Sequence, residues 1–282
     1  MVFNKNVGKI PQQSRRERYI LEIDLNTDHI KEFIRSERKS NPVLDRFLSM
    51  MEDGFVADEN GHREPLTHIG IDIDSVGVVY FLTRTLKAAY TVETGFGMGT
   101  SAMSMLAAKY DMPDHRHISI DPFGLSDGAG LVLLRHLESR HGDHFERVWE
   151  ASELALPAMV KRGEDRPLML AMIDGDHRFD GALVDFFYMD RLLAVDGRIL
   201  IDDIAYPAVE TLLNFITTNK PNYLIEEIGR FAVLRKREAD DQRQWDHFRA
   251  FAVPKRQDWT PRGLEPVEPK RRSRLARLLR GR

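Results

Sequence analysis

The chain has 282 residues, which is enough for one large domain with attachments or for two small domains. Of these residues, 42% are hydrophobic and 30% are charged, as in globular proteins. It contains no cysteine, so structural disulfides, thiolate metal sites and cysteine nucleophiles are excluded. The net charge is −3, and no signal-peptide pattern or run of 18 apolar residues occurs, which predicts a cytoplasmic protein.

Residues 1–66 are polar and charged and predict a helical N-terminal extension. Two modest helical patterns occur there, one with Ile30, Phe33 and Ile34 and one with Leu44, Phe47 and Leu48. We expect this extension to act either as a lid or as an oligomerisation arm. If it is an oligomerisation arm, the chain forms a homo-oligomer.

Residues 67–237 alternate between apolar strands and helical patterns. Strands are expected at 89–94, 117–122, 145–151, 168–174, 197–204, 222–229 and 230–237. Helices are expected at 75–88, 100–110, 127–140, 157–162, 179–194 and 208–219. This alternation predicts an α/β, Rossmann-like fold with a seven-stranded, mostly parallel sheet and helices on both faces. A Gly-Arg turn separates the two final strands, which should therefore pair antiparallel.

A glycine loop, "VETGFGMGTSA" (92–102), lies between the first strand and its helix. Its glycines are Gly95, Gly97 and Gly99. They allow a sharp turn and close approach of the backbone to a ligand, toward which the following helix directs its free N–H groups. The G-x-G-x-G spacing differs from the dinucleotide pattern G-x-G-x-x-G, and no P-loop is present. Glu93, before the loop, would repel a pyrophosphate but suits a cationic or amine-bearing ligand.

Asp121 ends the second strand, 22 residues after the last glycine of the loop, where a carboxylate can accept both hydroxyls of a ribose. With Glu93 it predicts an adenosine-type ligand that has a positively charged or zwitterionic end, and S-adenosylmethionine fits this description. The alternative is a simple tight turn with Asp121 as a cap. A nicotinamide oxidoreductase is disfavoured by the glycine spacing.

The glycine loop and the segment "ISIDP" resemble motifs I and II of the class I S-adenosylmethionine-dependent methyltransferases. The downstream segment "MIDGDHRFDGALVDFFYMDRLLAVDGRILIDDI" is similar to the subgroup of metal-dependent macrolide and sugar O-methyltransferases. The resemblance covers about residues 70–237. It implies a set of cofactor-binding residues: Glu93, Gly95, Phe96, Gly97, Gly99, Thr100, Ser101 and Asp121. It also places Ser152 near the adenine, with the N-cap of the next helix as the alternative role.

Three carboxylates end the fourth and fifth strands, namely Asp174 and the adjacent pair Asp202 and Asp203. Adjacent strand residues point in opposite directions, so the pair can converge only if the chain turns there, as the nearby Tyr206-Pro207 suggests. Converging carboxylates repel without a cation, and oxygen ligands suit Mg²⁺, Mn²⁺ or Ca²⁺. The resemblance likewise implies Mg²⁺ bound by these three residues. Catechol-type enzymes have Asp-Asn at the pair, so one of the two aspartates here could instead support the site.

His177 lies three residues after Asp174. An imidazole suits proton transfer because it exchanges its proton near neutral pH. The resemblance implies that His177 is the general base and that Asp174 shares in catalysis. The alternative is that Asp176 caps the next helix and that His177 is an exposed loop residue.

The function predicted from these motifs is metal-dependent O-methylation of a hydroxyl on a small-molecule acceptor such as a sugar or a natural product. Two alternatives stay open. One is a metal-independent O- or N-methyltransferase with His177 as base, and the other is a non-catalytic scaffold that binds an adenosine ligand.

Residues 238–282 form a polar C-terminal extension with a basic tail. The last fourteen residues carry seven positive charges and no acid, so residues 1–268 carry a net charge of −10. The acidic body predicts no nucleic-acid partner. In the tail, Leu275, Leu278 and Leu279 share one helical face, which predicts weak contact with an anionic membrane surface. A solvated terminus and docking on the acidic body are the alternatives.

Overall fold

The computed structural model describes residues 23–57, 60–66, 71–122, 128–163, 166–239 and 243–254. The helices are α1 (Thr27–Arg38), α2 (Pro42–Asp53), α3 (Ile73–Thr85), α4 (Thr100–Ala107), α5 (Gly128–His141), α6 (Ser152–Arg162), α7 (Phe179–Leu192) and α8 (Pro207–Asn219). The strands are β1 (Phe55–Ala57), β2 (Arg63–Pro65), β3 (Tyr90–Thr94), β4 (Arg116–Ile120), β5 (Phe145–Val148), β6 (Leu168–Ile173), β7 (Leu193–Ile201), β8 (Tyr223–Ile228) and β9 (Phe231–Lys236).

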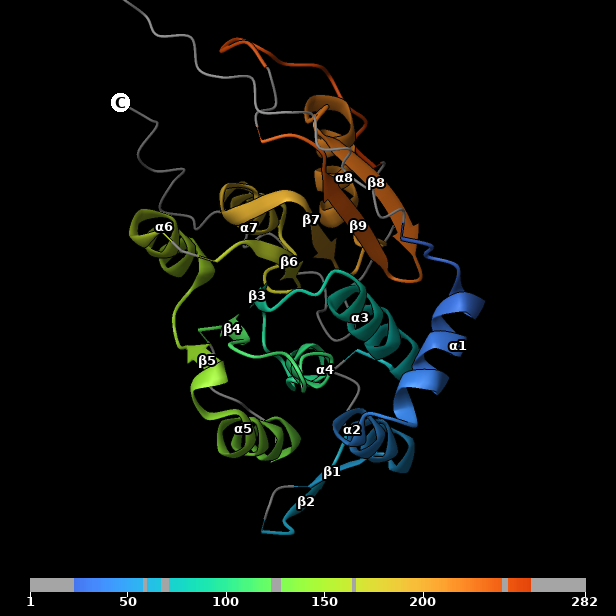
Figure 1. The fold of residues 1–282 in the computed structure, drawn as a ribbon. Coiled ribbons are helices and arrows are strands. Elements are labelled where there is room, and N and C mark those ends of the chain that lie inside the picture. The colour runs from blue at the N-terminus through green and yellow to red at the C-terminus, as the bar shows by residue number, and fades with distance from the viewer. Residues whose placement is uncertain are drawn as a thin grey trace, which may run out of the picture.

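The central sheet has seven strands in the order β5-β4-β3-β6-β7-β9-β8 (Figure 1). Strands β3 to β7 run parallel, and β9 is antiparallel to both of its neighbours, β7 and β8. The predicted Rossmann-like sheet is therefore confirmed. The strand order reverses between β3 and β6, and in such sheets ligands bind at the carboxyl ends of the strands beside this point.

Helices cover both faces of the sheet because the strand side chains alternate between two apolar cores (Figure 1). In β6, for example, Met172 packs into the core beneath α3, α4 and α5, and Ile173 packs into the core beneath α6, α7 and α8. Both strand faces must be apolar for this, which explains the nearly continuous apolar runs in the sequence.

The N-terminal helices α1 and α2 pack on α3 and α4 and share their core. Leu44 and Phe47 of α2 are fully buried. Asn41 is also buried, where its side-chain oxygen accepts hydrogen bonds from the first turn of α2 and its amide donates to Tyr80 Oη and Ala107 O, both at 2.9 Å. These helices are therefore joined to the domain by buried contacts, and a role as a lid or oligomerisation arm stays a prediction.

Two elements begin at least four residues earlier than expected. Helix α6 begins at Ser152 and not at Pro157, because packing of Leu156 and Met159 offsets the one backbone hydrogen bond that an internal proline removes. Strand β7 begins at Leu193 because a register shift against β6 accommodates Asp196, whose φ is 66°.

No helix in the described part of the chain is long and apolar enough to cross a membrane. The basic tail, for which membrane-surface contact was predicted, lies outside the described residues.

Candidate active site

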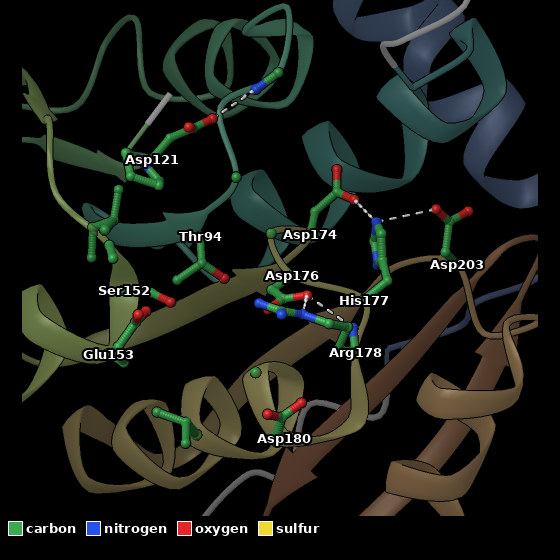
Figure 2. Close-up of a pocket in the computed structure, with 18 of the residues that line it drawn as sticks. Thr94, Asp121, Ser152, Glu153, Asp174, Asp176, His177, Arg178, Asp180 and Asp203 are labelled. Atoms are coloured by element: carbon green, nitrogen blue, oxygen red, sulfur yellow. Dashed lines mark hydrogen bonds and ion pairs between the residues drawn. The ribbon is translucent and has the colours of Figure 1, made fainter. Parts of the chain in front are cut away.

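A cavity of about 760 Å³ opens at the carboxyl ends of β3, β4, β6 and β7 (Figure 2). Its lining comes from the loops after these strands, from the first turns of α6 and α7, and from the turn between β8 and β9. It therefore lies at the position where the sheet topology predicts a ligand.

The glycine loop forms one wall of this cavity, and it has no space for a side chain at Gly95. Gly95 has a φ of 85°, and an added Cβ would lie 2.0 Å from the carbonyl oxygen of Asp174. At Gly99, with a φ of 81°, an added Cβ would lie 2.4 Å from the ring of Phe96. The first glycine thus permits contact between the ends of β3 and β6, and the other makes room for a buried aromatic ring.

Asp121 holds the glycine loop in place. Its Oδ2 accepts hydrogen bonds from the backbone N–H of Phe96 at 2.8 Å and of Gly97 at 3.3 Å. Arg147, which sequence reasoning missed, donates to the Asp121 carbonyl at 3.3 Å and stacks on the Phe96 ring at 4.5 Å. Asp121 also lines the cavity, so it combines a structural contact with access to a ligand.

The predicted cofactor-binding residues divide into two groups. Those that line the cavity are Gly95, Gly97, Asp121 and Ser152. Those that lie outside its lining are Glu93, Phe96, Gly99, Thr100 and Ser101. The second group shapes the loop from behind, because its polar and aromatic side chains are buried.

Glu93 does not face the cavity as expected, because side chains alternate along β3 and the neighbouring Thr94 takes the cavity side. The Glu93 carboxylate is fully buried, accepts a hydrogen bond from Ser119 Oγ, and lies 3.2 Å from His117 Nε2. Lys109 is buried in the same cluster, and burial holds its pKa well below the ordinary value. Glu93 therefore belongs to a buried polar cluster behind the glycine loop.

Asp174, His177 and Asp203 converge at the ends of β6 and β7 (Figure 2). His177 Nε2 lies 3.7 Å from Asp174 Oδ1 and 3.4 Å from Asp203 Oδ2, and the edge of the Tyr206 ring packs on the imidazole. Burial, together with the negative charges of Asp202 and Asp203, raises the pKa of Asp174 well above its ordinary value. Asp174 therefore favours its protonated, neutral form at this edge of the sheet.

Asp202 has a different environment from its neighbour, because the chain turns at Asp203, whose φ is 54°. Asp202 is fully buried, and its Oδ1 accepts hydrogen bonds from Arg230 Nε at 2.5 Å and from the Asp203 N–H at 2.6 Å. Its Oδ2 makes no hydrogen bond of good geometry in the described part of the chain, although the Asp174 carboxyl lies close to the Asp202 side chain. Burial raises the pKa of Asp202 as well.

The three predicted metal ligands are therefore not arranged as expected. Within the described residues, ligand atoms of Asp174, His177 and Asp203 lie within 4.8 Å of one another and form a group that could hold a metal ion. Asp202 does not belong to this group. The structure replaces it with His177 and sets Asp202 against Arg230.

The alternative capping roles for Ser152 and Asp176 are wrong. Ser152 is the first residue of α6, and the N-cap is Ala151 without a side-chain hydrogen bond. The N-cap of α7 is Arg178, whose backbone N–H and guanidinium both bind the Asp176 carboxylate. Ser152 and Asp176 both line the cavity and are therefore available to a ligand.

Asp185 of α7 is a buried carboxyl near the hydroxyls of Ser152 and Thr94, to which it makes no hydrogen bond of good geometry. Burial raises its pKa from 3.8 to about 6, so the folded chain binds this proton more tightly than the unfolded chain. The contribution of this proton to the free energy of unfolding is fully present below pH 3.8 and is lost as the pH rises through about 6.

We therefore expect Asp185→Asn to raise the free energy of unfolding by up to about 3 kcal/mol at pH 8, because a shift of one pKa unit corresponds to about 1.4 kcal/mol. The gain should be much smaller near pH 4. Urea denaturation at both pH values measures it, with the exposed Asp180→Asn in the same helix as control. An equal gain at the two pH values would contradict the explanation.

Comparison with known proteins agrees with this geometry. Residues 92–204 match the model of a family described as a methyltransferase domain. The chain is a methyltransferase. No curated protein sequence matches the enzyme significantly.

Solved structures with a similar fold include cofactor-bound Rv0187 from MTB, which is 19% identical with a TM-score of 0.51 and aligns over 70% of this chain and 90% of that one. An O-methyltransferase from Bacillus cereus in complex with SAH is 13% identical, with a TM-score of 0.52 and coverage of 70% and 91%. TomG from Streptomyces achromogenes, an O-methyltransferase of tomaymycin synthesis in complex with SAM, is 14% identical, with a TM-score of 0.50 and coverage of 61% and 84%. At such identities the likeness is one of fold. The matched domain and this fold are both those of methyltransferases.

Proposed function

We propose that the enzyme transfers a methyl group from S-adenosylmethionine to a hydroxyl of a small molecule, with His177 as general base. The observation that carries this proposal is the position of His177, whose Nε2 lies between the carboxylates of Asp174 and Asp203 in the same cavity as the glycine loop. An imidazole held between two acidic side chains is oriented for proton transfer.

Several residues fit the methyl donor. The backbone at Gly95 and Gly97 can approach the ligand closely, and Asp121 and Ser152 supply polar groups along the same wall. The buried Thr94 also lines the cavity, and its hydroxyl lies between the cavity and the buried Asp185 carboxyl. When bound, S-adenosylmethionine supplies an activated methyl group, so the protein contributes mainly alignment and deprotonation.

His177 would accept the proton of the acceptor hydroxyl as the oxygen forms its new bond to the methyl carbon. The bond between that carbon and the sulfonium sulfur breaks, which leaves S-adenosylhomocysteine and a methyl ether. The proton then passes from the imidazole to solvent, to which His177 is open with 31% of its side chain exposed.

For the acceptor we propose a hydroxyl-rich molecule such as a sugar or a glycosylated natural product. The lining of the cavity includes charged groups from Glu153, Asp176, Arg178 and Asp180, which suit hydrogen bonding to several hydroxyls. This choice agrees with the resemblance to sugar O-methyltransferases.

Metal-assisted O-methylation is the second candidate, favoured by the group of Asp174, His177 and Asp203. A divalent cation held there would lower the pKa of the acceptor hydroxyl. His177 would then be a ligand and unable to serve as base, so the two candidates assign this residue different roles.

The test is calorimetry with S-adenosylhomocysteine and NAD, followed by a methyl-transfer screen over sugar, phenol and polyketide acceptors with and without EDTA. We expect binding of S-adenosylhomocysteine alone and transfer to a hydroxyl that EDTA leaves unchanged. Loss of transfer in EDTA with recovery by Mg²⁺ would support the second candidate, and tight NAD binding would contradict both.

A further inference from the structure

Arg230 brings a positive charge to the position that the resemblance gives to a metal ion. It lies in the turn between β8 and β9 and lines the active-site cavity. Its Nε donates to Asp202 Oδ1 at 2.5 Å, and its Nη2 donates to Asp203 Oδ1 at 2.7 Å. One guanidinium thus bridges the two adjacent carboxylates, a geometry for which arginine is well suited.

The turn that carries Arg230 is fixed to the loop that carries the two aspartates. The backbone N–H of Ile204 donates to the Arg230 carbonyl at 3.3 Å, and Ile201 at the end of β7 pairs with Ala232 of β9. The guanidinium is therefore held beside the carboxylates by backbone contacts as well as by its own ion pairs.

The Arg230 contacts also determine which oxygens are available to other groups. Asp202 is fully buried, so its carboxylate cannot turn toward an added ion while Arg230 holds Oδ1. On Asp203, Arg230 holds Oδ1, and Oδ2 lies 3.4 Å from His177 Nε2. Three of the four oxygens of the pair that would bind a cation are thus engaged by Arg230 and His177.

We propose that Arg230 replaces the divalent cation at this edge of the sheet: it neutralises the Asp202–Asp203 pair and positions Asp203 against His177. Arg230 is a positioning residue, since it acts through Asp203. This inference rests on the proposed role of His177 as base. It goes further, because it predicts that a metal site is latent in the chain and that the arginine side chain blocks it.

The test measures Mn²⁺ binding by electron paramagnetic resonance in the wild type, in Arg230→Ala and in Arg235→Ala. Arg235 is the matched control because it lies on β9, just after Arg230, and pairs with Asp196. We expect Arg230→Ala to gain one Mn²⁺ site at least about tenfold tighter than any site in the wild type or the control, because it frees two carboxylates. Adding Asp203→Asn to Arg230→Ala should abolish this site. Methyl transfer by Arg230→Ala should become dependent on Mn²⁺, whereas the wild type is unaffected by EDTA.

Two results would overturn the proposal. One is tight, stoichiometric binding of Mn²⁺ by the wild type that is lost in Asp174→Asn or Asp203→Asn. This result needs no arginine variant. The other is a folded Arg230→Ala, or Arg230→Met if the alanine variant does not fold, that gains no site. Because metal binding is read without turnover, failure of the proposed O-methylation would appear separately, as absent methyl transfer or absent S-adenosylhomocysteine binding.

Discussion

Replacement of His177 by alanine is expected to lower kcat by about 10²–10⁴-fold, the usual contribution of a general base. The imidazole is the group in the cavity that two carboxylates orient, and alanine leaves the acceptor hydroxyl without a proton acceptor. Binding of S-adenosylhomocysteine should change little, because the glycine loop and Asp121 are untouched. Single-turnover kinetics and calorimetry measure the two quantities separately.

The control for this variant is His62→Ala, which removes an exposed histidine near β2 and should leave kcat unchanged. His177→Gln distinguishes the two candidate functions, because an amide keeps a polar side chain but accepts no proton. A kcat of His177→Ala within about threefold of the wild-type value, with an intact fold, would remove His177 from the role of base.

The sequence predicts the sheet and the loops at its edge because both depend on local patterns. Apolar runs identify the strands, and the residues that end them, such as Asp121, Asp174 and Asp203, must then lie at one edge. The alternation of side chains in β3 is equally local. It would have placed Glu93 and Thr94 on opposite faces and so have corrected the expected role of Glu93.

The same reasoning could not predict the groups that complete the site, because these groups come from distant parts of the chain. Arg230 is 27 residues from Asp203, and Arg147 is 26 residues from Asp121. A motif shows that a strand ends in carboxylates, but it does not show which side chain balances their charge. In this chain an arginine from the turn between β8 and β9 does so for Asp202 and Asp203, and a metal ion was the expected group.

The glycine loop provides the second large effect. Gly95→Ala should weaken binding of S-adenosylhomocysteine by at least about 100-fold and lower the free energy of unfolding by about 3 kcal/mol or more, because a clash adds to left-handed backbone strain. The added Cβ would lie 2.0 Å from the Asp174 carbonyl oxygen and 2.9 Å from Gly175 Cα, so the ends of β3 and β6 would have to separate. The wall that carries Asp174 would move with them. Calorimetry and urea denaturation measure the two losses.

Gly54→Ala is the matched control because it separates the clash from the backbone conformation. Gly54 ends α2 with a φ of 72°, close to the 85° of Gly95, but an added Cβ there would meet no atom within 4 Å. It should therefore cost only the strain of a left-handed alanine, about 1–2 kcal/mol, and leave ligand binding unchanged. Wild-type affinity for S-adenosylhomocysteine in Gly95→Ala would mean that the ligand does not depend on the contact between β3 and β6, and the cofactor site would have to lie elsewhere in the cavity.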